Sequence, residues 1–376
     1  MPAEWVSAFA PGRVNLIGEH TDYNGGLALP FAITQGVTVR GRADPGAGSE
    51  PLDADGAAGA RDETSPSWGA RIEVTARDLG EHDAFSVGER APGGGWRAFV
   101  RGAAGELARA GWTLPAAALE IGGDLPRGAG LSSSAALEVA LCLALIELAR
   151  EPRPPRPAAL ELARLCARVE NDWVGARTGL LDQLASLCGE AEQAVLIDFR
   201  TLEVERVPLP LDGWRLAVLD SGERHELASS GYNARREDCA RACELLGIEH
   251  LGEADEAGLV ELPNPLQLRA RHVLGEDERV RSAVDALRAG ELALLGPLLD
   301  ASHESLRDQY QVSTPAVDAA AARLRESGAA GARMIGGGFG GSVLGLFPPG
   351  IRPPQDTLDV RPSAGAHLLE AGAAGR

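Results

Sequence analysis

Four short segments of the chain have strand-like patterns of apolar and polar positions. In one of them, Ile72, Val74 and Ala76 repeat with a period of two, which is typical of a strand with one buried face. The other three are richer in apolar and β-branched residues. The pattern predicts strands at residues 70–76, 117–121, 194–199 and 215–222.

Helical patterns dominate much of the remaining chain. Residues 132–150 are apolar on nearly every face, which indicates a helix buried between other elements, and the prolines of EPRPPRP at 151–157 end it. A further helix ends at Gly247, because glycine favours the position after a helix C-terminus. The sequence predicts additional helices at residues 158–169, 227–246, 276–289, 291–309 and 315–326, and a solvated loop at 43–68.

The length and composition favour a globular protein with two domains. At 376 residues the chain exceeds what one hydrophobic core usually covers. Its 44% apolar and 24% charged residues are those of an ordinary folded protein. From the change in element order we expect a boundary near residue 200, which separates domains at 1–200 and 201–376.

The charge excludes several functions. The net charge of -18 disfavours binding to nucleic acid or to an anionic membrane. All 36 basic residues are arginine, so the chain has neither the lysine of a Walker A loop nor that of a protein kinase.

The five cysteines form no C-x-x-C pair, and no secretory signal or membrane span is visible in the sequence. We therefore expect a cytoplasmic protein, acting as a monomer.

Two glycine-containing segments carry groups suited to ligand binding. APGRVNLIGEHTDYNGG, residues 10–26, concentrates charged and polar side chains between glycines that let the backbone approach a ligand, although a polar loop between strands is the alternative. PRGAGLSSSAALE, residues 126–138, opens directly onto the buried helix. The unpaired N–H groups and positive dipole end of a helix start favour anions, and the serine hydroxyls can reach phosphate or hydrated Mg²⁺.

A third segment, MIGGGFGGSVLGLF at residues 334–347, also contains many glycines. Gly336, Gly338 and Gly341 formally match the dinucleotide-binding pattern G-x-G-x-x-G. The residues that follow resemble a strand, whereas a dinucleotide site requires a helix there. We therefore expect this loop to approach substrate and nucleotide without a Rossmann fold.

Together the three segments closely resemble those of galactokinases in the GHMP small-molecule kinase superfamily, and the resemblance covers nearly the whole chain. It implies an α/β and α+β fold of two domains, with a βαβ-type N-terminal domain, a ferredoxin-like C-terminal domain and the active site between them. The implied reaction transfers phosphate from ATP to the anomeric hydroxyl of D-galactose, with Mg²⁺ as cofactor.

The resemblance also assigns roles to particular residues. Asp182 matches the aspartate that accepts the proton of the anomeric hydroxyl, and Arg13 matches an arginine that stabilises the transition state. Ser134 and Glu170 match Mg²⁺ ligands. The implied nucleotide-binding residues are Gly128, Ala129, Gly130, Leu131, Ser132, Ser133 and Ser134, with Trp96 beside the adenine. The implied galactose-binding residues are Glu19, His20, Asp22, Gly179, Asp182 and Tyr232.

Some positions depart from the family pattern and leave alternatives open. Ile335 stands where the family usually has threonine, and Ser342 where cysteine is common. Arg177, five residues before Asp182, could reshape the sugar pocket or favour an acidic sugar. Another GHMP sugar kinase, acting on galacturonate, arabinose or N-acetylgalactosamine, is one rival. A galactose sensor without catalytic activity is another, although the intact set of Arg13, Glu170 and Asp182 argues against it.

Overall fold

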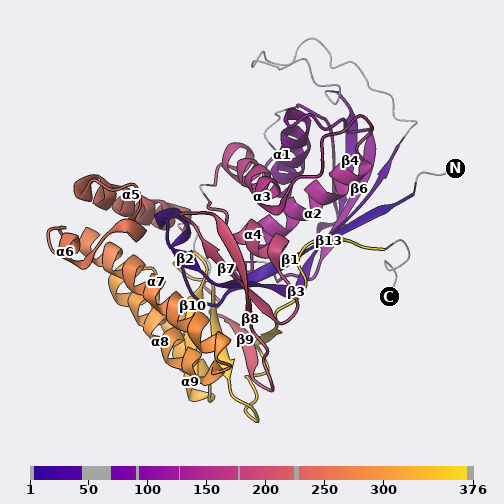
Figure 1. The fold of residues 1–376 in the computed structure, drawn as a ribbon. Coiled ribbons are helices and arrows are strands. Elements are labelled where there is room, and N and C mark those ends of the chain that lie inside the picture. The colour runs from indigo at the N-terminus through magenta and orange to yellow at the C-terminus, as the bar shows by residue number, and fades with distance from the viewer. Residues whose placement is uncertain are drawn as a thin grey trace.

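The computed structural model of the chain describes residues 4–44, 69–89, 93–126, 128–176, 178–223 and 228–370. Arg177, most of the predicted loop at 43–68 and the predicted start of a helix at residue 227 lie outside these residues. The described chain forms two groups of helices, which lie on either side of the central strands (Figure 1).

The largest sheet belongs mainly to the N-terminal half. Its strand order is β13-β1-β3-β6-β4-β5. The strands are β1 (Val6–Asn15), β3 (Pro30–Ala43), β4 (Arg71–Ala76), β5 (Glu81–Ser86), β6 (Ala117–Gly123) and β13 (His367–Leu368). Within it, β4 and β6 pair in parallel, and the chain passes from one to the other through β5 and α1. This parallel pair with its helical connection is a βαβ-type unit.

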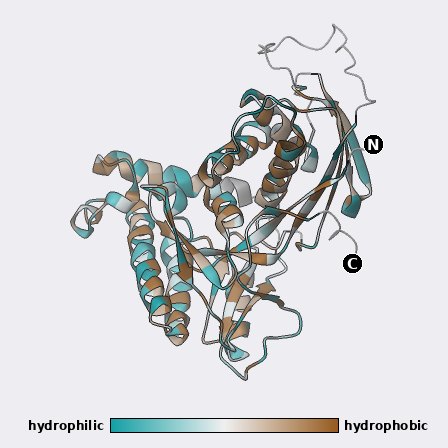
Figure 2. Cartoon of the chain, turned by 45° about the vertical axis from the view of Figure 1, so that its right-hand side comes forward, coloured by the Kyte–Doolittle hydropathy of each residue, from teal (hydrophilic) through white to brown (hydrophobic). Residues whose placement is uncertain are grey.

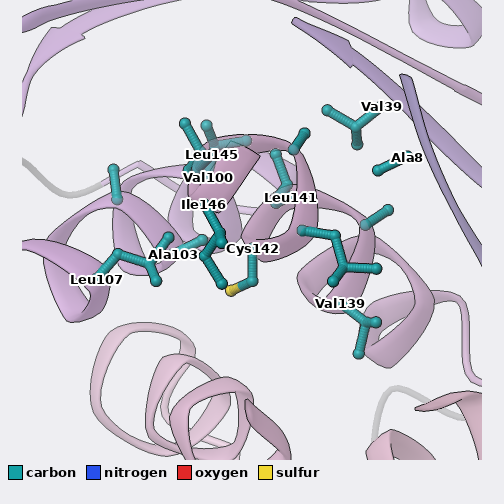
Figure 3. Close-up of a cluster of buried hydrophobic side chains, with 14 of the residues drawn as sticks. Ala8, Val39, Val100, Ala103, Leu107, Val139, Leu141, Cys142, Leu145 and Ile146 are labelled. Carbon is teal, nitrogen blue, oxygen red and sulfur yellow. The ribbon is translucent and has the colours of Figure 1, made fainter. Parts of the chain in front are cut away.

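Helices cover one face of this sheet. They are α1 (Trp96–Arg109), α2 (Ser133–Leu148), α3 (Ala159–Arg168) and α4 (Leu181–Cys188). Helix α2 contacts β1 and β3 on one side and the other three helices on the rest of its surface, which explains its apolar residues on all faces. Figure 3 shows this core, in which side chains of two strands meet α1 and α2 at Ala8, Val39, Val100, Ala103, Leu107, Val139, Leu141, Cys142, Leu145 and Ile146.

Two smaller sheets complete the strand framework. The first has the order β10-β11-β9-β12 and consists of β9 (Arg215–Asp220), β10 (Gly331–Ile335), β11 (Ser342–Phe347) and β12 (Leu358–Val360). The second consists of β2 (Leu27–Ala28), β7 (Gln193–Asp198) and β8 (Glu203–Pro208). All their pairings are antiparallel.

The second group of helices packs with these sheets. It comprises α5 (Ala228–Leu246), α6 (Glu256–Leu259), α7 (Leu266–Arg288), α8 (Leu295–Ser305) and α9 (Pro315–Glu326). Figure 2 shows hydrophilic and hydrophobic faces on these helices, as expected for elements with one buried side. In the described part of the chain, no helix is long and apolar enough to cross a lipid bilayer.

Most of the predicted elements are confirmed. The helix that is apolar on nearly every face is α2, and α5 ends at Leu246, directly before Gly247, whose φ of +66° suits the position after a helix. The prediction at 276–289 was wrong about the helix start, since α7 begins at Leu266 and includes Gly275 in its interior. The predicted helix at 291–309 is α8 flanked by a 3-10 turn and a π-helical segment, Leu306–Tyr310.

The chain ends connect the two halves. Strand β13, near the C-terminus, pairs with β1, whereas Leu16 and Ile17, just after β1, pack in a core shared with Leu344 and Leu346 of β11. The N-terminal segment therefore leaves the large sheet and enters the C-terminal half. The boundary near residue 200 stays a prediction.

Candidate active site

A cavity of about 250 Å³ lies where the N-terminal segment 10–26, the start of α4, helix α5 and the glycine loop between β10 and β11 meet. It is lined by Arg13, Glu19, His20, Asp22, Thr178, Gly179, Leu181, Asp182, Tyr232, Gly336 and Gly337. The structure thus brings together all the residues expected to bind sugar and the two expected to catalyse transfer. A larger hollow of about 610 Å³ between α6 and α7 includes none of them.

Arg13 and Asp182 form an ion pair at one side of the cavity. The Nε and Nη2 atoms of Arg13 both lie 2.7 Å from Oδ1 of Asp182. Ser132 donates its hydroxyl to Oδ2 of Asp182 at 2.5 Å, and Arg13 Nη1 donates to the carbonyl of Gly130 at 2.7 Å. The guanidinium and the carboxylate are therefore fixed to the glycine–serine loop, residues 128–134. The Asp182 side chain is 30% exposed and that of Arg13 is 8% exposed.

The glycine–serine loop leads into the first turn of α2. Gly128 and Gly130 have φ values of +70°, and Ser132, at the position before the helix, has φ of +57°. Ala129 and Leu131 are buried in a hydrophobic core, which anchors the loop. The Ser132 side chain makes no capping bond to the helix and instead reaches Asp182. The first-turn N–H groups of α2 are thereby left for an anion.

Ser134 and Glu170 lie together near this loop. Glu170 Oε2 accepts from the Thr178 hydroxyl at 2.5 Å and from Gln183 Nε2 at 3.0 Å. Burial raises the pKa of Glu170, and the charge of Asp182 raises it further, whereas the Ser134 side chain lowers it. A hydroxyl and a carboxylate are oxygen donors of the kind that Mg²⁺ prefers. Among the described residues no group of three or more His, Cys, Asp or Glu side chains is arranged to hold a metal.

Behind this pair lies a second buried carboxyl group. Glu138, one turn after Ser134 on α2, accepts a hydrogen bond from Gln183 Nε2 at 3.2 Å. Burial, together with the charge of Glu170, raises the pKa of Glu138 to about 10, so this group is neutral at physiological pH. Gln183 therefore bridges two carboxyl groups, of which only Glu170 approaches the loop.

Two acidic residues lie on the sugar side of the cavity. Glu19 Oε1 accepts from the backbone N–H of Gly336 at 2.8 Å, and burial raises the pKa of Glu19. Burial and the nearby charge of Asp182 raise the pKa of Asp22 to about 6. At Gly179 a Cβ would lie 2.1 Å from Oδ2 of Asp22, so only glycine leaves room for that carboxylate.

His20 and Tyr232 provide the ring systems of the cavity. His20 is 3% exposed and has φ of +64°, a backbone conformation rare outside glycine and often found at functional sites. Its Nδ1 lies 2.8 Å from the hydroxyl of Tyr23. Burial lowers the pKa of His20 well below its usual value, so the imidazole is neutral. The ring of Tyr232, from α5, lies 5.6 Å from the His20 ring.

Several residues at the site were not singled out from the sequence. Thr178, Leu181 and Gly337 line the cavity. Arg333, which is fully buried, donates to the carbonyls of Asn15 and Leu16 and lies 3.5 Å from Glu19. An arginine directly before an apolar strand residue and a glycine run is the signal that could have identified it.

Trp96, Ile335 and Ser342, which the sequence also singled out, do not line the cavity. Trp96 begins α1, and its Nε1 donates to Glu81 at 2.9 Å, so its place beside an adenine stays a prediction. Ile335 is buried in the core that also holds Ala129 and Leu131. Ser342 begins β11 and is buried there.

Family models match three parts of the chain. Residues 2–43 match the galactokinase galactose-binding signature, residues 98–190 the GHMP kinases N-terminal domain, and residues 283–358 the GHMP kinases C-terminal domain. A galactokinase from Mycobacterium bovis is 42% identical over 361 residues, which cover 91% of this chain and 89% of that protein. A galactokinase from Thermotoga petrophila is 38% identical over 338 residues, which cover 90% and 88%.

Solved structures have the same fold. Lactococcus lactis galactokinase, crystallised in complex with galactose, superposes with a TM-score of 0.83 at 30% identity and covers 97% of this chain and 95% of its own. Methanococcus jannaschii mevalonate kinase, at 15% identity and a TM-score of 0.64 over 96% of this chain and 99% of its own, shows the fold alone. The expected two-domain GHMP kinase fold is confirmed, and the chain belongs to the galactokinase family.

Proposed function

We propose that the protein transfers the γ-phosphoryl group of ATP to the anomeric hydroxyl of D-galactose, giving α-D-galactose 1-phosphate and ADP. The observation that carries this proposal is the Arg13–Asp182 pair, which lines the cavity and is bonded at the same time to the glycine–serine loop at the start of α2. One pair of side chains therefore contacts both the cavity for the acceptor and the loop suited to phosphate.

The cavity has the chemistry that a neutral hexose requires. Glu19 and Asp22 offer carboxylate oxygens to sugar hydroxyls, and His20 and Tyr232 offer polar atoms on apolar rings. Buried groups of this kind discriminate strongly between sugars. An analogue that lacks a hydroxyl leaves them unpaired, which lowers its kcat/KM by roughly 10⁴- to 10⁵-fold. The galactose bound to the Lactococcus lactis relative supports this assignment.

In the proposed transfer, the anomeric oxygen forms a bond to the γ-phosphorus while the bond from that phosphorus to the β–γ bridging oxygen breaks. The hydroxyl proton passes to Asp182, and the bridging oxygen leaves with ADP. Arg13 holds Asp182 toward the acceptor and places its positive charge beside the transferring group. The N–H groups at the start of α2 bind the phosphates.

Ser134 and Glu170 would hold a Mg²⁺ ion, since a hydroxyl and a carboxylate are oxygen donors of the kind that it prefers. A magnesium ion bound there would neutralise phosphate charge. Within the chain, Thr178 and Gln183 hold the Glu170 carboxylate in place through the two hydrogen bonds described above. Glu170 thus presents its oxygens close to Ser134.

A panel of sugars tests the proposal. ADP release by the purified chain would be measured with ATP, Mg²⁺ and D-galactose, D-galacturonate, L-arabinose, N-acetyl-D-galactosamine or D-glucose. We expect kcat/KM to be highest for D-galactose, with the phosphate on C1 of the product by ³¹P NMR. Rapid turnover of D-galacturonate with negligible turnover of D-galactose would reject the proposal. Binding of D-galactose without turnover of any sugar would identify a sensor instead.

A further inference from the structure

A row of hydroxyl and thiol groups leads from α5 to the ring of His20. The Sγ atom of Cys239 lies 3.1 Å from the hydroxyl of Tyr310, which lies 2.7 Å from the hydroxyl of Tyr23. The Tyr23 hydroxyl in turn lies 2.8 Å from Nδ1 of His20. Tyr310 is fully buried, and Cys239 and His20 are only 2% and 3% exposed. The row is therefore mostly buried, and Tyr23 is its half-buried member.

The His20 ring is held by its neighbours. Its centroid lies 4.6 Å from that of Tyr310 and 6.0 Å from that of Tyr23, which it meets edge-on. The backbone of His20 is fixed by the hydrogen bond that Asn24 Nδ2 donates to its carbonyl at 2.6 Å. The other ring nitrogen, Nε2, is buried and has no partner among the described residues, although His20 lines the cavity. A buried polar atom of this kind is suited to a ligand group.

The protons of the row can fill its three contacts in either direction, and the direction fixes the tautomer of His20. Cys239, Tyr310 and Tyr23 each carry one proton, and three contacts join them to each other and to His20. If each group donates toward the histidine, all three contacts are filled and Nδ1 accepts. A neutral imidazole then carries its hydrogen on Nε2.

The chemistry of the cavity favours donation toward the histidine. Glu19, Asp22 and Asp182 all line it with acceptor groups. A hydroxyl that donates its proton to one of these carboxylates keeps oxygen lone pairs that need a donor. An N–H at Nε2 supplies one, whereas a bare Nε2 would add a further acceptor.

We propose that Tyr23 and Tyr310 are positioning residues for sugar recognition. Through the row they set the tautomer of His20, so that Nε2–H donates to one hydroxyl oxygen of the sugar. This inference rests on the proposed function, because it names how that same cavity selects a hexose. Neither tyrosine contacts the sugar through this row, since both act through His20.

The tautomer can be measured without turnover. In the free full-length chain labelled with ¹⁵N-histidine, the His20 signals would be assigned by their loss in His20→Gln. We expect a protonated Nε2 and an unprotonated Nδ1 in the wild type, and a mixture of tautomers in Tyr23→Phe. A proton on Nδ1 in the wild type would overturn the inference and leave the proposed kinase activity untouched.

A second experiment tests the proposal by steady-state kinetics with D-galactose and its monodeoxy analogues. We expect Tyr23→Phe to raise KM for D-galactose about three- to tenfold, as for the loss of one oriented hydrogen bond, and Tyr310→Phe to raise it less. We expect kcat and KM for ATP to change by less than about twofold. Cys243→Ala, one turn after Cys239 on α5 and outside the row, is the matched control and should keep wild-type values.

The monodeoxy series distinguishes positioning from a general loss of packing. One sugar, which lacks the hydroxyl bound by Nε2–H, should bind the wild type weakly and show no further loss in Tyr23→Phe. An equal KM penalty with every sugar, or none with any, would overturn the inference. If the wild type phosphorylated no galactose at all, the proposed function would fail, and the histidine spectrum would still test the row.

Discussion

Arg13 on β1 and Asp182 in the first turn of α4 are 169 positions apart in the chain, yet two guanidinium nitrogens lie 2.7 Å from one carboxylate oxygen. The second carboxylate oxygen is bonded to Ser132. A guanidinium on one side and a hydroxyl on the other hold Asp182 in a single orientation. That orientation is the basis of the proposed transfer, because a general base must meet the proton it accepts.

Replacing Asp182 by asparagine should remove most of the activity. The amide keeps the size of the side chain and cannot accept the hydroxyl proton, so we expect kcat to fall about 10²- to 10⁴-fold. The affinity for a non-hydrolysable ATP analogue, measured by calorimetry, should change little. Asp285→Asn, at an exposed carboxylate on α7, is the control. Near-normal turnover in Asp182→Asn would show that another group accepts the proton.

Replacing Arg13 by lysine should impair catalysis although it keeps the charge. A single ammonium group cannot contact Asp182 and the carbonyl of Gly130 with the geometry of the planar guanidinium. We expect kcat to fall at least about tenfold, with a smaller change in KM for D-galactose. Steady-state kinetics at saturating ATP measure both constants. A change in KM alone would indicate that Arg13 only binds ground-state sugar.

Replacing Gly179 by alanine should damage the sugar site selectively. The new methyl group would meet Oδ2 of Asp22, so the carboxylate must move out of its position. We expect KM for D-galactose to rise about tenfold or more, since a displaced polar contact costs about 1–3 kcal/mol, while KM for ATP stays unchanged. Gly122→Ala on β6 is the matched control, because its Cβ would make only ordinary contacts, 3.8 Å from Asp78. Equal kinetics in the two variants would contradict this role.

Replacing Asp22 by asparagine should stabilise the free protein and weaken sugar binding. The pKa of Asp22 is raised from 3.8 to about 6. Protonation of Asp22 therefore stabilises the folded protein fully below pH 3.8, and this stabilisation is lost as the pH rises through 6. Above that pH the buried charge costs about 1–3 kcal/mol. We expect the Asp22→Asn variant to have a higher Tm than the wild type at pH 8 and a similar Tm at pH 4, by calorimetry.

The same variant should bind D-galactose less tightly, because an amide accepts hydrogen bonds less strongly than a carboxylate. In the wild type, KM for D-galactose should rise as the pH falls below 6 and Asp22 becomes protonated. A lower Tm for Asp22→Asn at pH 8, or an unchanged KM, would contradict the account of this residue.

Much of the fold and site could be predicted from local patterns. The all-apolar residues of α2 identified a helix enclosed by other elements, and the three glycine-containing segments all reach the site through residues such as Arg13, Ser132 and Gly336. These predictions succeed because glycine, serine and apolar periodicity have direct local consequences. The start of α7 was missed because Gly275 was a plausible helix break, whereas tertiary packing keeps it helical.

The remaining features depend on contacts between distant residues. Tyr23 meets Tyr310 over 287 positions, and Arg333 reaches the carbonyl of Asn15 over 318. Neither pair has a local sequence pattern, since burial and hydrogen bonding join them only after folding. The need for glycine at position 179 likewise arises from Asp22, which approaches from the N-terminal signature.

The most direct test of the central claim is a crystal structure of the protein with D-galactose, Mg²⁺ and a non-hydrolysable ATP analogue. The account predicts the anomeric oxygen within hydrogen-bond reach of Asp182, and the terminal phosphate between Arg13 and the serines at the start of α2. A hexose bound beyond reach of Asp182, or a triphosphate bound away from Ser132, Ser133 and Ser134, would contradict it.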